Sequence, residues 1–301
     1  MNRDRHQSHL GLLYALAAYL AWGFIALYFH LLAAVPPLGI LCHRVLWSVG
    51  FLAILITAQG QWKNLLQSLR IPKALPMLLL STILIASNWY LFIFAIAHQR
   101  VIEASLGYFV TPLISVLLGI IFLRERLRPA QGVAIALAAI AVCNLAARST
   151  TFPWIALGLA ISFSLYGFIR KTVPVGPLIG LTVETSLLAP FAAAAIAAGA
   201  AGSLASWPRG TFPLLSLAGI ITAVPLLWFA AAARRMRLST LGFIQYISPT
   251  CQFLLGIAYF HEPLNRDKLT SFILIWTALA IFSADAILAH RAPQPVVAMA
   301  E

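Results

Sequence analysis

The chain is poor in charged residues. Of its 301 residues, only 8 are Asp or Glu and 20 are Lys or Arg, so charged side chains make up 9% of the chain. Hydrophobic residues reach 61%, and the mean hydropathy is +0.92. A chain with so few charges cannot cover a soluble core of this size with a polar surface. The composition therefore excludes an ordinary soluble domain and predicts an integral membrane protein.

Cysteines and catalytic motifs are also scarce. The three cysteines, Cys42, Cys143 and Cys251, lie singly in different apolar segments. This pattern matches neither a zinc site nor a disulfide framework. The chain has no H-E-x-x-H, no G-x-S-x-G, no P-loop and no paired aspartates within an apolar run. We therefore expect no enzymatic activity, no bound metal and no cofactor.

Long apolar runs fill most of the chain. A helix needs about 20 apolar residues to cross the hydrocarbon core of a bilayer. Such runs cover residues 10–32, 38–58, 74–97, 104–123, 129–147, 152–170, 177–199, 212–233, 239–260 and 268–289. The predicted fold is an all-α integral membrane protein with ten transmembrane helices. Residues 290–301 have the composition of a disordered cytoplasmic tail.

The fourth and ninth runs share a motif at one constant offset of 137 residues. The matched pairs are Pro112 with Pro249, Leu118 with Leu255, Gly119 with Gly256, and Glu125 with Glu262. A register kept over this length indicates an internal duplication. Because each half has an odd number of spans, the second half must enter the membrane upside down. We expect two inverted five-helix repeats, at residues 10–147 and 152–289.

Basic residues are distributed unevenly between the connections, and the net charge is +12. If the amino terminus is cytoplasmic, the inner segments hold Arg3, Arg5, Lys63, Arg70, Lys73, Arg124, Arg126, Arg128, Arg170, Lys171, Arg234, Arg235, Arg237 and Arg291. The outer segments hold only Arg100, Arg148, Arg209, Arg266 and Lys268. The positive-inside rule then places both termini in the cytoplasm. Scattering among short loops also argues against a nucleic-acid-binding face.

Several strings carry a family resemblance. They are His43-Arg44, Asn88-Trp89, E-A-S-L-G-Y-F at residues 103–109 and L-S-T-L-G-F-I-Q-Y-I at residues 238–247. These strings resemble RarD-type permeases of the drug/metabolite transporter superfamily, and the likeness runs from about residue 10 to residue 290. It covers both repeats, which that family calls EamA domains. The resemblance implies a bacterial inner-membrane permease that exports small metabolites, such as amino acids or drug-like compounds, by alternating access.

The duplicated motif also supplies polar residues within the apolar runs. In the fourth run Tyr108, Pro112 and Ser115 share one helical face, and in the ninth run Gln245, Pro249 and Gln252 repeat that spacing. In inverted repeats, Ser115 and Gln252 both fall near mid-depth, where such transporters bind their substrates. Contacts between packed helices are the alternative role for these polar residues. Pro112 and Pro249 are predicted hinges, with static bends as the alternative.

Two charged residues stand at equivalent places within spans of the two halves, Arg44 in the second and Glu184 in the seventh. Their expected depths differ by roughly 10 Å, so we do not expect them to pair directly. One interpretation is that Arg44 holds a substrate carboxylate and Glu184 holds an amine or exchanges a coupling proton. In the other, Arg44 extends towards the outer surface and Glu184 towards the inner one.

Aromatic residues complete the candidate site. Trp22, Trp89, Tyr166 and Trp228 recur at symmetric or nearly symmetric places, and Asn88 adds a polar group beside Trp89. They are predicted to line a substrate pocket, with helix packing and interface anchoring as the alternative. The expected partners are a small-molecule substrate and the bilayer, and both a monomer and a homodimer remain open. A flippase for a lipid-linked headgroup is the alternative function.

Overall fold

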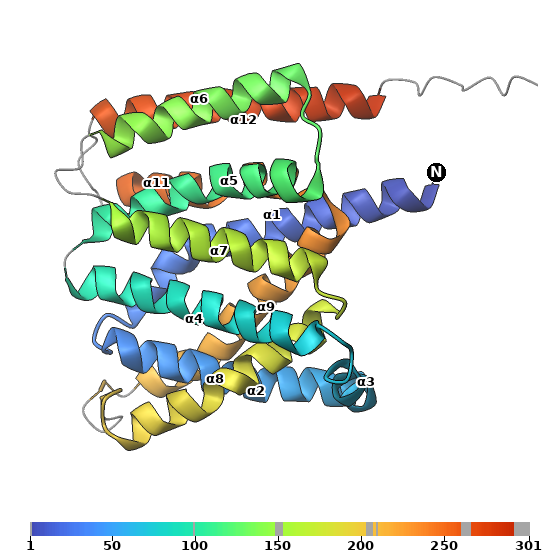
Figure 1. Ribbon diagram of the computed structural model, residues 1–301. Coiled ribbons are helices and arrows are strands. Elements are labelled where there is room, and N and C mark those ends of the chain that lie inside the picture. Colours follow the sequence, from blue (N-terminus) through green and yellow to red (C-terminus); the bar gives the residue numbers. More distant parts are fainter. Residues whose placement is uncertain are drawn as a thin grey trace, which may run out of the picture.

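The computed structural model describes residues 2–98, 100–147, 153–202, 207–208, 210–259 and 266–291. Over these residues the regular secondary structure is helical throughout. The helices are α1 (Asn2–Leu31), α2 (Pro37–Ala58), α3 (Trp62–Ser68), α4 (Ala74–Ala97), α5 (Val101–Leu123), α6 (Pro129–Ala146), α7 (Trp154–Thr172), α8 (Pro177–Ala197), α9 (Thr211–Arg235), α10 (Leu238–Ile244), α11 (Ile247–Ala258) and α12 (Arg266–Arg291). Most of the long helices run alongside one another, and α9 crosses them obliquely (Figure 1).

The helices have the length and surface of membrane spans. Among the described residues, 8 helical segments are long and apolar enough to cross a bilayer, and Pro129–Asn144 forms a shorter apolar helix. Large apolar side chains cover the outside of the bundle, with Ile54 67%, Ile83 61% and Phe191 75% exposed. Such a surface is stable against lipid chains and would aggregate in water. The protein is therefore an all-helical, multi-pass membrane protein.

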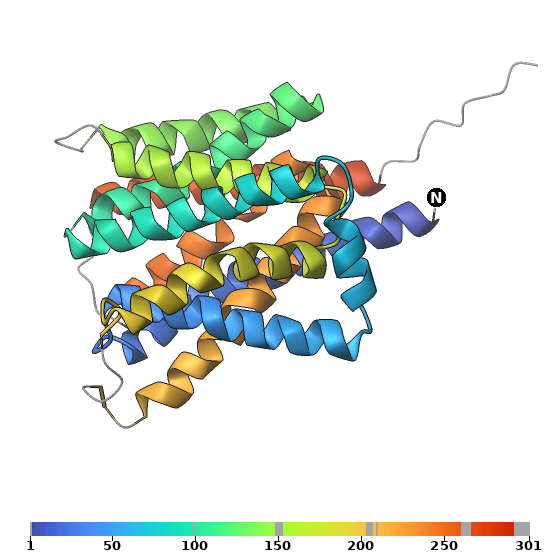
Figure 2. The same cartoon turned by 60° about the horizontal axis from the view of Figure 1, so that its bottom comes forward.

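The helices pack in layers (Figures 1 and 2). At one edge α6 and α12 form a pair, and next to them α5 packs against α7 and α10. At the opposite edge α2 packs against α8 and α9, while α1 contacts both α9 and α11. Close approach between α2 and α9 needs Gly219, because a Cβ atom there would lie 2.4 Å from the backbone of Trp47. Small residues commonly permit such contacts between membrane helices.

The predicted single span at residues 239–260 is interrupted. Helix α10 ends at Ile244 and α11 begins at Ile247. Pro249 has no N–H group to donate to the carbonyl of Gln245, and the backbone N–H of Ser248 donates to that carbonyl instead, at 3.0 Å. Pro112, at the matched position of the repeat, lies inside the continuous helix α5. The two prolines of the duplicated motif therefore occupy different local structures.

Several sequence predictions concern residues outside the described part of the chain. These are Glu262, Arg148, Arg209 and the predicted tail beyond Arg291. The short helix α3, between α2 and α4, was not among the predicted elements.

Candidate functional site

A cavity of about 560 Å³ lies between α1, α2, α4, α5, α9 and the break between α10 and α11. Eight residues predicted from the sequence line it: Trp22, Arg44, Asn88, Trp89, Tyr108, Gln245, Pro249 and Gln252. Leu32, Ala33 and Val35 also line it, so the cavity extends to the α1–α2 connection at one end of the bundle (Figure 1). Its volume falls within the range of small-molecule sites, roughly 300 to 1,000 Å³.

Arg44 is the charged residue of this cavity. Its Nε donates a hydrogen bond to Oγ1 of Thr222 at 2.9 Å. Its Cζ lies 5.2 Å from the ring centroid of Trp89 and 5.5 Å from that of Phe29, which are distances for cation–π contacts. Among the described residues, no ion pair involves Arg44, and the lining includes no Asp or Glu. The cavity therefore presents a cation without a protein carboxylate opposite it.

The helix break brings polar groups to the cavity. Gln245 caps the end of α10, and Gln252 in α11 donates from Nε2 to the backbone carbonyl of Trp22 at 3.1 Å. Across the cavity, Nδ2 of Asn88 donates to the carbonyl of Leu159 at 2.9 Å and to Ser162 Oγ at 3.0 Å. Interrupted helices at membrane depth are tolerated where they line a cavity rather than face lipid.

Packed aromatic rings form part of the cavity lining. Trp22 lies 5.7 Å from both Phe163 and Phe229, measured between ring centroids, and Phe163 lies 5.2 Å from Phe229. Tyr166 stacks on Phe229 at 6.1 Å. Tyr19 also lines the cavity, and its buried hydroxyl has no hydrogen-bond partner among the described residues. The aromatic cluster separates the Arg44 cavity from a second polar cluster around Glu184.

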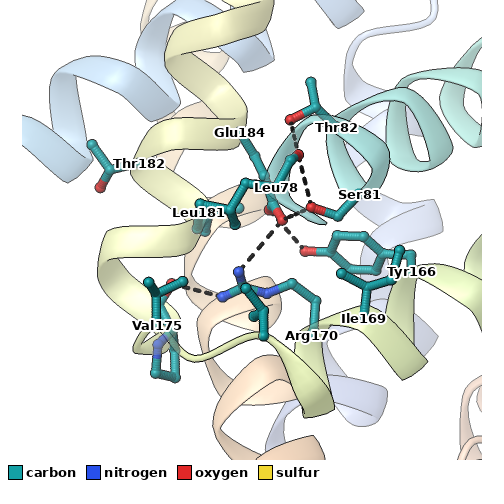
Figure 3. Close-up of polar contacts among 12 residues, drawn as sticks. Leu78, Ser81, Thr82, Tyr166, Ile169, Arg170, Val175, Leu181, Thr182 and Glu184 are labelled. Carbon is teal, nitrogen blue, oxygen red and sulfur yellow. Dashed lines mark hydrogen bonds and ion pairs between the residues drawn. The ribbon is translucent and has the colours of Figure 1, made fainter. Parts of the chain in front are cut away.

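The carboxylate of Glu184 lies in a buried network (Figure 3). Ser81 Oγ donates to its Oε1 at 2.5 Å, and the hydroxyl of Tyr166 donates to its Oε2 at 3.2 Å. Arg170 Nη1 lies 3.4 Å from Oε1 and forms an ion pair with it. Glu184 does not line the Arg44 cavity among the described residues. The symmetric sequence positions of Arg44 and Glu184 thus have separate surroundings.

Arg170, which the sequence analysis counted among the basic residues of the inner segments, lies in the last turn of α7 and pairs with Glu184. Arg170 belongs to α7 and is 0% exposed. Its Nη2 donates to the carbonyl of Pro177 at 3.0 Å, and Gly180 leaves room for the guanidinium, since a Cβ there would lie 1.9 Å from Nη1. A buried cation requires a partner, and the short α7–α8 connection brings Glu184 close enough to provide one. The sequence offers one indication of this pair: Arg170 and Glu184 are only 14 residues apart, near the facing ends of two helices joined by a short connection.

Ser115, Tyr166, Trp228 and Pro112 do not line the cavity. Ser115 Oγ donates to Ser164 Oγ at 3.2 Å, and a Cβ on Gly242 would lie 2.8 Å from the Cβ of Ser115. Ser115 therefore lies in the contact between α5, α7 and α10. Trp228 is partly buried against the apolar core. Ser115 and Trp228 therefore lie in contacts between packed helices, which was the alternative role for these residues. Tyr166 instead contributes to the network around Glu184.

A polar contact at the other end of the bundle was not predicted. Glu125, which follows α5, accepts hydrogen bonds from the backbone N–H groups of Leu238 and Ser239, at 2.6 and 2.9 Å, and from Ser239 Oγ at 2.6 Å. Nε of Arg237 lies 3.9 Å from the same carboxylate. Glu125 thereby caps the start of α10 and ties it to the end of α5. We refer to this group as the Glu125 latch.

A multi-pass helical bundle with a ligand-sized, partly polar cavity beside an interrupted helix is typical of a solute transporter. The model of the EamA-like transporter family matches residues 9–146. Protein RarD of Escherichia coli (strain K12) is 46% identical over 294 residues, which cover 96% of this chain and 98% of that protein. Uncharacterized transporter YojE of Bacillus subtilis (strain 168) is 42% identical over 277 residues, 91% of this chain and 93% of that protein.

The chain belongs to the EamA-like transporter family, as a RarD-type permease. A more distant relative from Pseudomonas aeruginosa, 30% identical over 281 residues, is named chloramphenicol-sensitive protein RarD. A protein of known crystal structure has the same fold, with a TM-score of 0.72 at 22% identity over 94% of this chain and 99% of that one.

Proposed function

We propose that the protein is a bacterial inner-membrane permease that exports a small metabolite, such as an amino acid or a drug-like compound, by alternating access through the Arg44 cavity. The observation that carries this proposal is a cavity of about 560 Å³ that holds an arginine without a carboxylate partner among the described residues. A buried charge is costly inside a membrane bundle, and charged residues at such positions usually belong to a solute or ion pathway.

The helix contacts support the proposed arrangement of ten spans as two inverted repeats. If α1, α2, α4, α5 and α6 correspond to α7, α8, α9, α10–α11 and α12, most of the larger contacts occur in exchanged pairs. The contact of α1 with α9 is matched by that of α7 with α4, and the contact of α2 with α9 by that of α8 with α4. The pairs α2–α8, α5–α10 and α6–α12 are their own counterparts. This pattern fits repeats at 10–147 and 152–289 related by a twofold axis in the membrane plane.

The two ends of the cavity differ in a way that supports alternating access. The cavity extends to the α1–α2 connection, while the Glu125 latch lies at the α5–α6 connection, at the other end of the bundle (Figure 1). With both termini in the cytoplasm, as the positive-inside rule predicts, the cavity end is external and the latch end cytoplasmic. Transport then requires the latch end to open. Pro249, next to the α10–α11 break, and Pro112 are the proposed hinges.

Proton coupling is the finer part of the proposal. Glu184 is its candidate group, because it is a carboxylate buried inside the bundle and intramembrane carboxylates commonly act as proton carriers. In this role Glu184 would exchange a proton while Arg170 releases or re-forms the ion pair. A flux that responds to a pH gradient in the parent protein, and no longer responds in Glu184→Gln, would support it.

Flux into proteoliposomes tests the permease proposal. The purified full-length protein is reconstituted, and uptake of a panel of amino acids and drug-like compounds is measured with and without a pH gradient. Arg44→Ala should abolish uptake, whereas Arg128→Ala, at the exposed end of α6, should retain it. If the Arg44→Ala variant retains uptake, the Arg44 cavity is not the substrate site. Movement of a labelled lipid headgroup without solute flux would instead favour a flippase.

A further inference from the structure

We propose that the Arg44 cavity takes an organic anion, namely a small molecule with one carboxylate, held by Arg44, and an apolar body about the size of a phenyl ring. This inference rests on the permease proposed above and narrows its substrates to organic anions without an ammonium group, so it favours anionic drug-like compounds over amino acids. The described lining contains no carboxylate that could pair with an amine or a cationic drug, so we do not expect such ligands to bind.

The unmatched charge of Arg44 is the first argument. A guanidinium has five N–H donors, and in Arg44 only Nε has a hydrogen-bond acceptor among the described residues, Thr222. No described lining residue carries a carboxylate. The two Nη groups therefore have donors available for a planar anion, and a carboxylate matches that pair of donors in a bidentate contact.

Arg170 provides an internal comparison. It is also a buried arginine, but it has a permanent carboxylate partner in Glu184 and a carbonyl acceptor at Pro177. Arg44 has instead two aromatic faces, those of Trp89 and Phe29. Aromatic faces stabilise a cation without occupying its N–H donors in a salt bridge. Arg44 can thus remain charged in an empty cavity and bind and release an anion that a fixed carboxylate would exclude.

The rest of the lining specifies the body of the ligand. Most of the lining is apolar, including Ile25, Ile40, Ile85 and Leu226, and the packed rings of Trp22 and Phe163 also contribute to it. Burial of apolar surface against these side chains favours a hydrophobic body of moderate size. An ammonium group placed here would be removed from water with no described carboxylate to pair with it. The expected ligand therefore has one anionic end and one apolar end.

Binding to the purified full-length protein tests this directly and without transport. The probes share one phenyl body: 3-phenylpropanoate, its neutral amide 3-phenylpropanamide, and 2-phenylethylamine, while acetate tests the anion alone. Fluorescence of the cavity tryptophans, Trp22 and Trp89, reports binding. The carboxylate should bind about tenfold more tightly than the amide or more, as expected for a charge-assisted pair. Acetate and the amine should bind more weakly than 3-phenylpropanoate.

Variants assign the effect to Arg44. Arg44→Gln should abolish the preference for the acid over the amide, and Arg128→Gln, an exposed arginine outside the cavity, should retain it. If Arg44→Gln fails to fold, Thr222→Val serves instead, because it keeps the charge but removes the acceptor that holds Nε. It should reduce the preference several-fold. An unchanged preference in the folded variant would overturn the inference.

The remaining outcomes separate this inference from the permease proposal. Equal binding of acid and amide, tighter binding of the amine or of acetate, or no binding of any probe would overturn the inference. Tight, Arg44-dependent binding of the acid without any flux in proteoliposomes would contradict the permease function but support the anion site. Flux of a cationic or neutral solute without binding of the acid would support the permease and overturn the anion class.

Discussion

Nη1 of Arg170 lies 3.4 Å from Oε1 of Glu184, with both side chains buried between α7 and α8. The hydroxyl groups of Ser81 and Tyr166 complete the surroundings of this carboxylate (Figure 3). Opposite charges that neutralise each other in this way can remain within a bundle surrounded by lipid. The loss of either partner would leave the other as an uncompensated charge.

We expect Arg170→Leu to be strongly destabilising. Removal of one partner from a buried ion pair costs about 3 to 5 kcal/mol. The melting temperature in detergent, read by size-exclusion chromatography after heating, measures the loss. Arg128→Leu is the matched control, because its ion pair with Asp285 is exposed and such pairs contribute about 0 to 1 kcal/mol. Equal losses in the two variants would contradict a structural role for the Arg170–Glu184 pair. The double variant Arg170→Leu/Glu184→Leu should recover part of the stability.

Gly180→Ala should disrupt the same pair from the other side. The added Cβ would lie 1.9 Å from Nη1 of Arg170, so the guanidinium must move away from Glu184. We expect a loss of stability comparable in direction to that of Arg170→Leu. Gly132→Ala in α6 is the control, since a Cβ there meets no atom within 4 Å, and it should be at least as stable as the parent protein. If Gly180→Ala is as stable as Gly132→Ala, the guanidinium of Arg170 does not lie against Gly180.

Glu125→Gln should weaken the latch between α5 and α10. The carboxylate accepts three hydrogen bonds from Leu238 and Ser239, and hydrogen bonds to charged groups contribute about 1.5 to 3 kcal/mol each. We expect a lower melting temperature and faster thiol labelling of a cysteine introduced at Leu241, which is 1% exposed. Ser239→Ala, which removes one of the three bonds, should show a smaller change in the same direction. If the cysteine at position 241 is labelled at the same rate with Glu125 and with Glu125→Gln, the Glu125 latch has no gating role.

Tyr19→Phe should keep or raise the stability of the ligand-free protein. The Tyr19 hydroxyl is buried without a partner among the described residues, and an unpaired buried polar group costs about 1 to 3 kcal/mol. Tyr246→Phe is the matched comparison, because the equally buried Tyr246 hydroxyl donates to the carbonyl of Phe109 at 3.2 Å. That variant should be less stable than the parent protein. If melting temperatures fall equally in both variants, the Tyr19 hydroxyl has a partner.

The matched prolines offer a test of the proposed hinges. Pro249→Ala restores an N–H group next to the α10–α11 break, so the two helices can become continuous, and we expect a lower rate of transport. Pro112→Ala lies inside the continuous helix α5 and should reduce transport less. Initial rates of uptake, normalised to the amount of folded protein, provide the comparison. A larger effect for Pro112→Ala would reverse the assignment of the principal hinge.

Much of the fold was predictable from local composition. Apart from α1, which begins at Asn2 instead of residue 10, the apolar runs predicted the ends of the long helices to within a few residues, because the thickness of the bilayer sets the length of a spanning helix. The ninth run shows the limit of this approach. Hydropathy does not distinguish a continuous helix from the interrupted pair α10 and α11. Pro112 and Pro249 match in the sequence, yet only Pro249 adjoins a break, because packing in each half decides whether the helix stays continuous.

The candidate site was predictable in part. Arg44, Asn88, Trp89 and Gln252 were selected as polar or aromatic residues within apolar runs, and the structure places them around one cavity. Glu184 was selected on the same grounds but lies in a different cluster. The sequence contains no signal for the pairing of Ser81 with Glu184, which are 103 residues apart. Such contacts depend on the rotation of each helix about its axis, and packing against several neighbours sets that rotation.

The sequence by itself determined that this is a multi-pass helical membrane protein, because composition and apolar length decide which solvent a helix can face. Its resemblance to RarD-type permeases rests on particular strings such as Asn88-Trp89, and the comparison with known proteins confirmed it. It also determined that the chain repeats a motif at a 137-residue offset. Only the tertiary structure decided that Arg44 faces a cavity without a described carboxylate while Arg170 is neutralised by Glu184. Both arginines lie in apolar helices, and what distinguishes them is the side chain that a neighbouring helix places within hydrogen-bond distance.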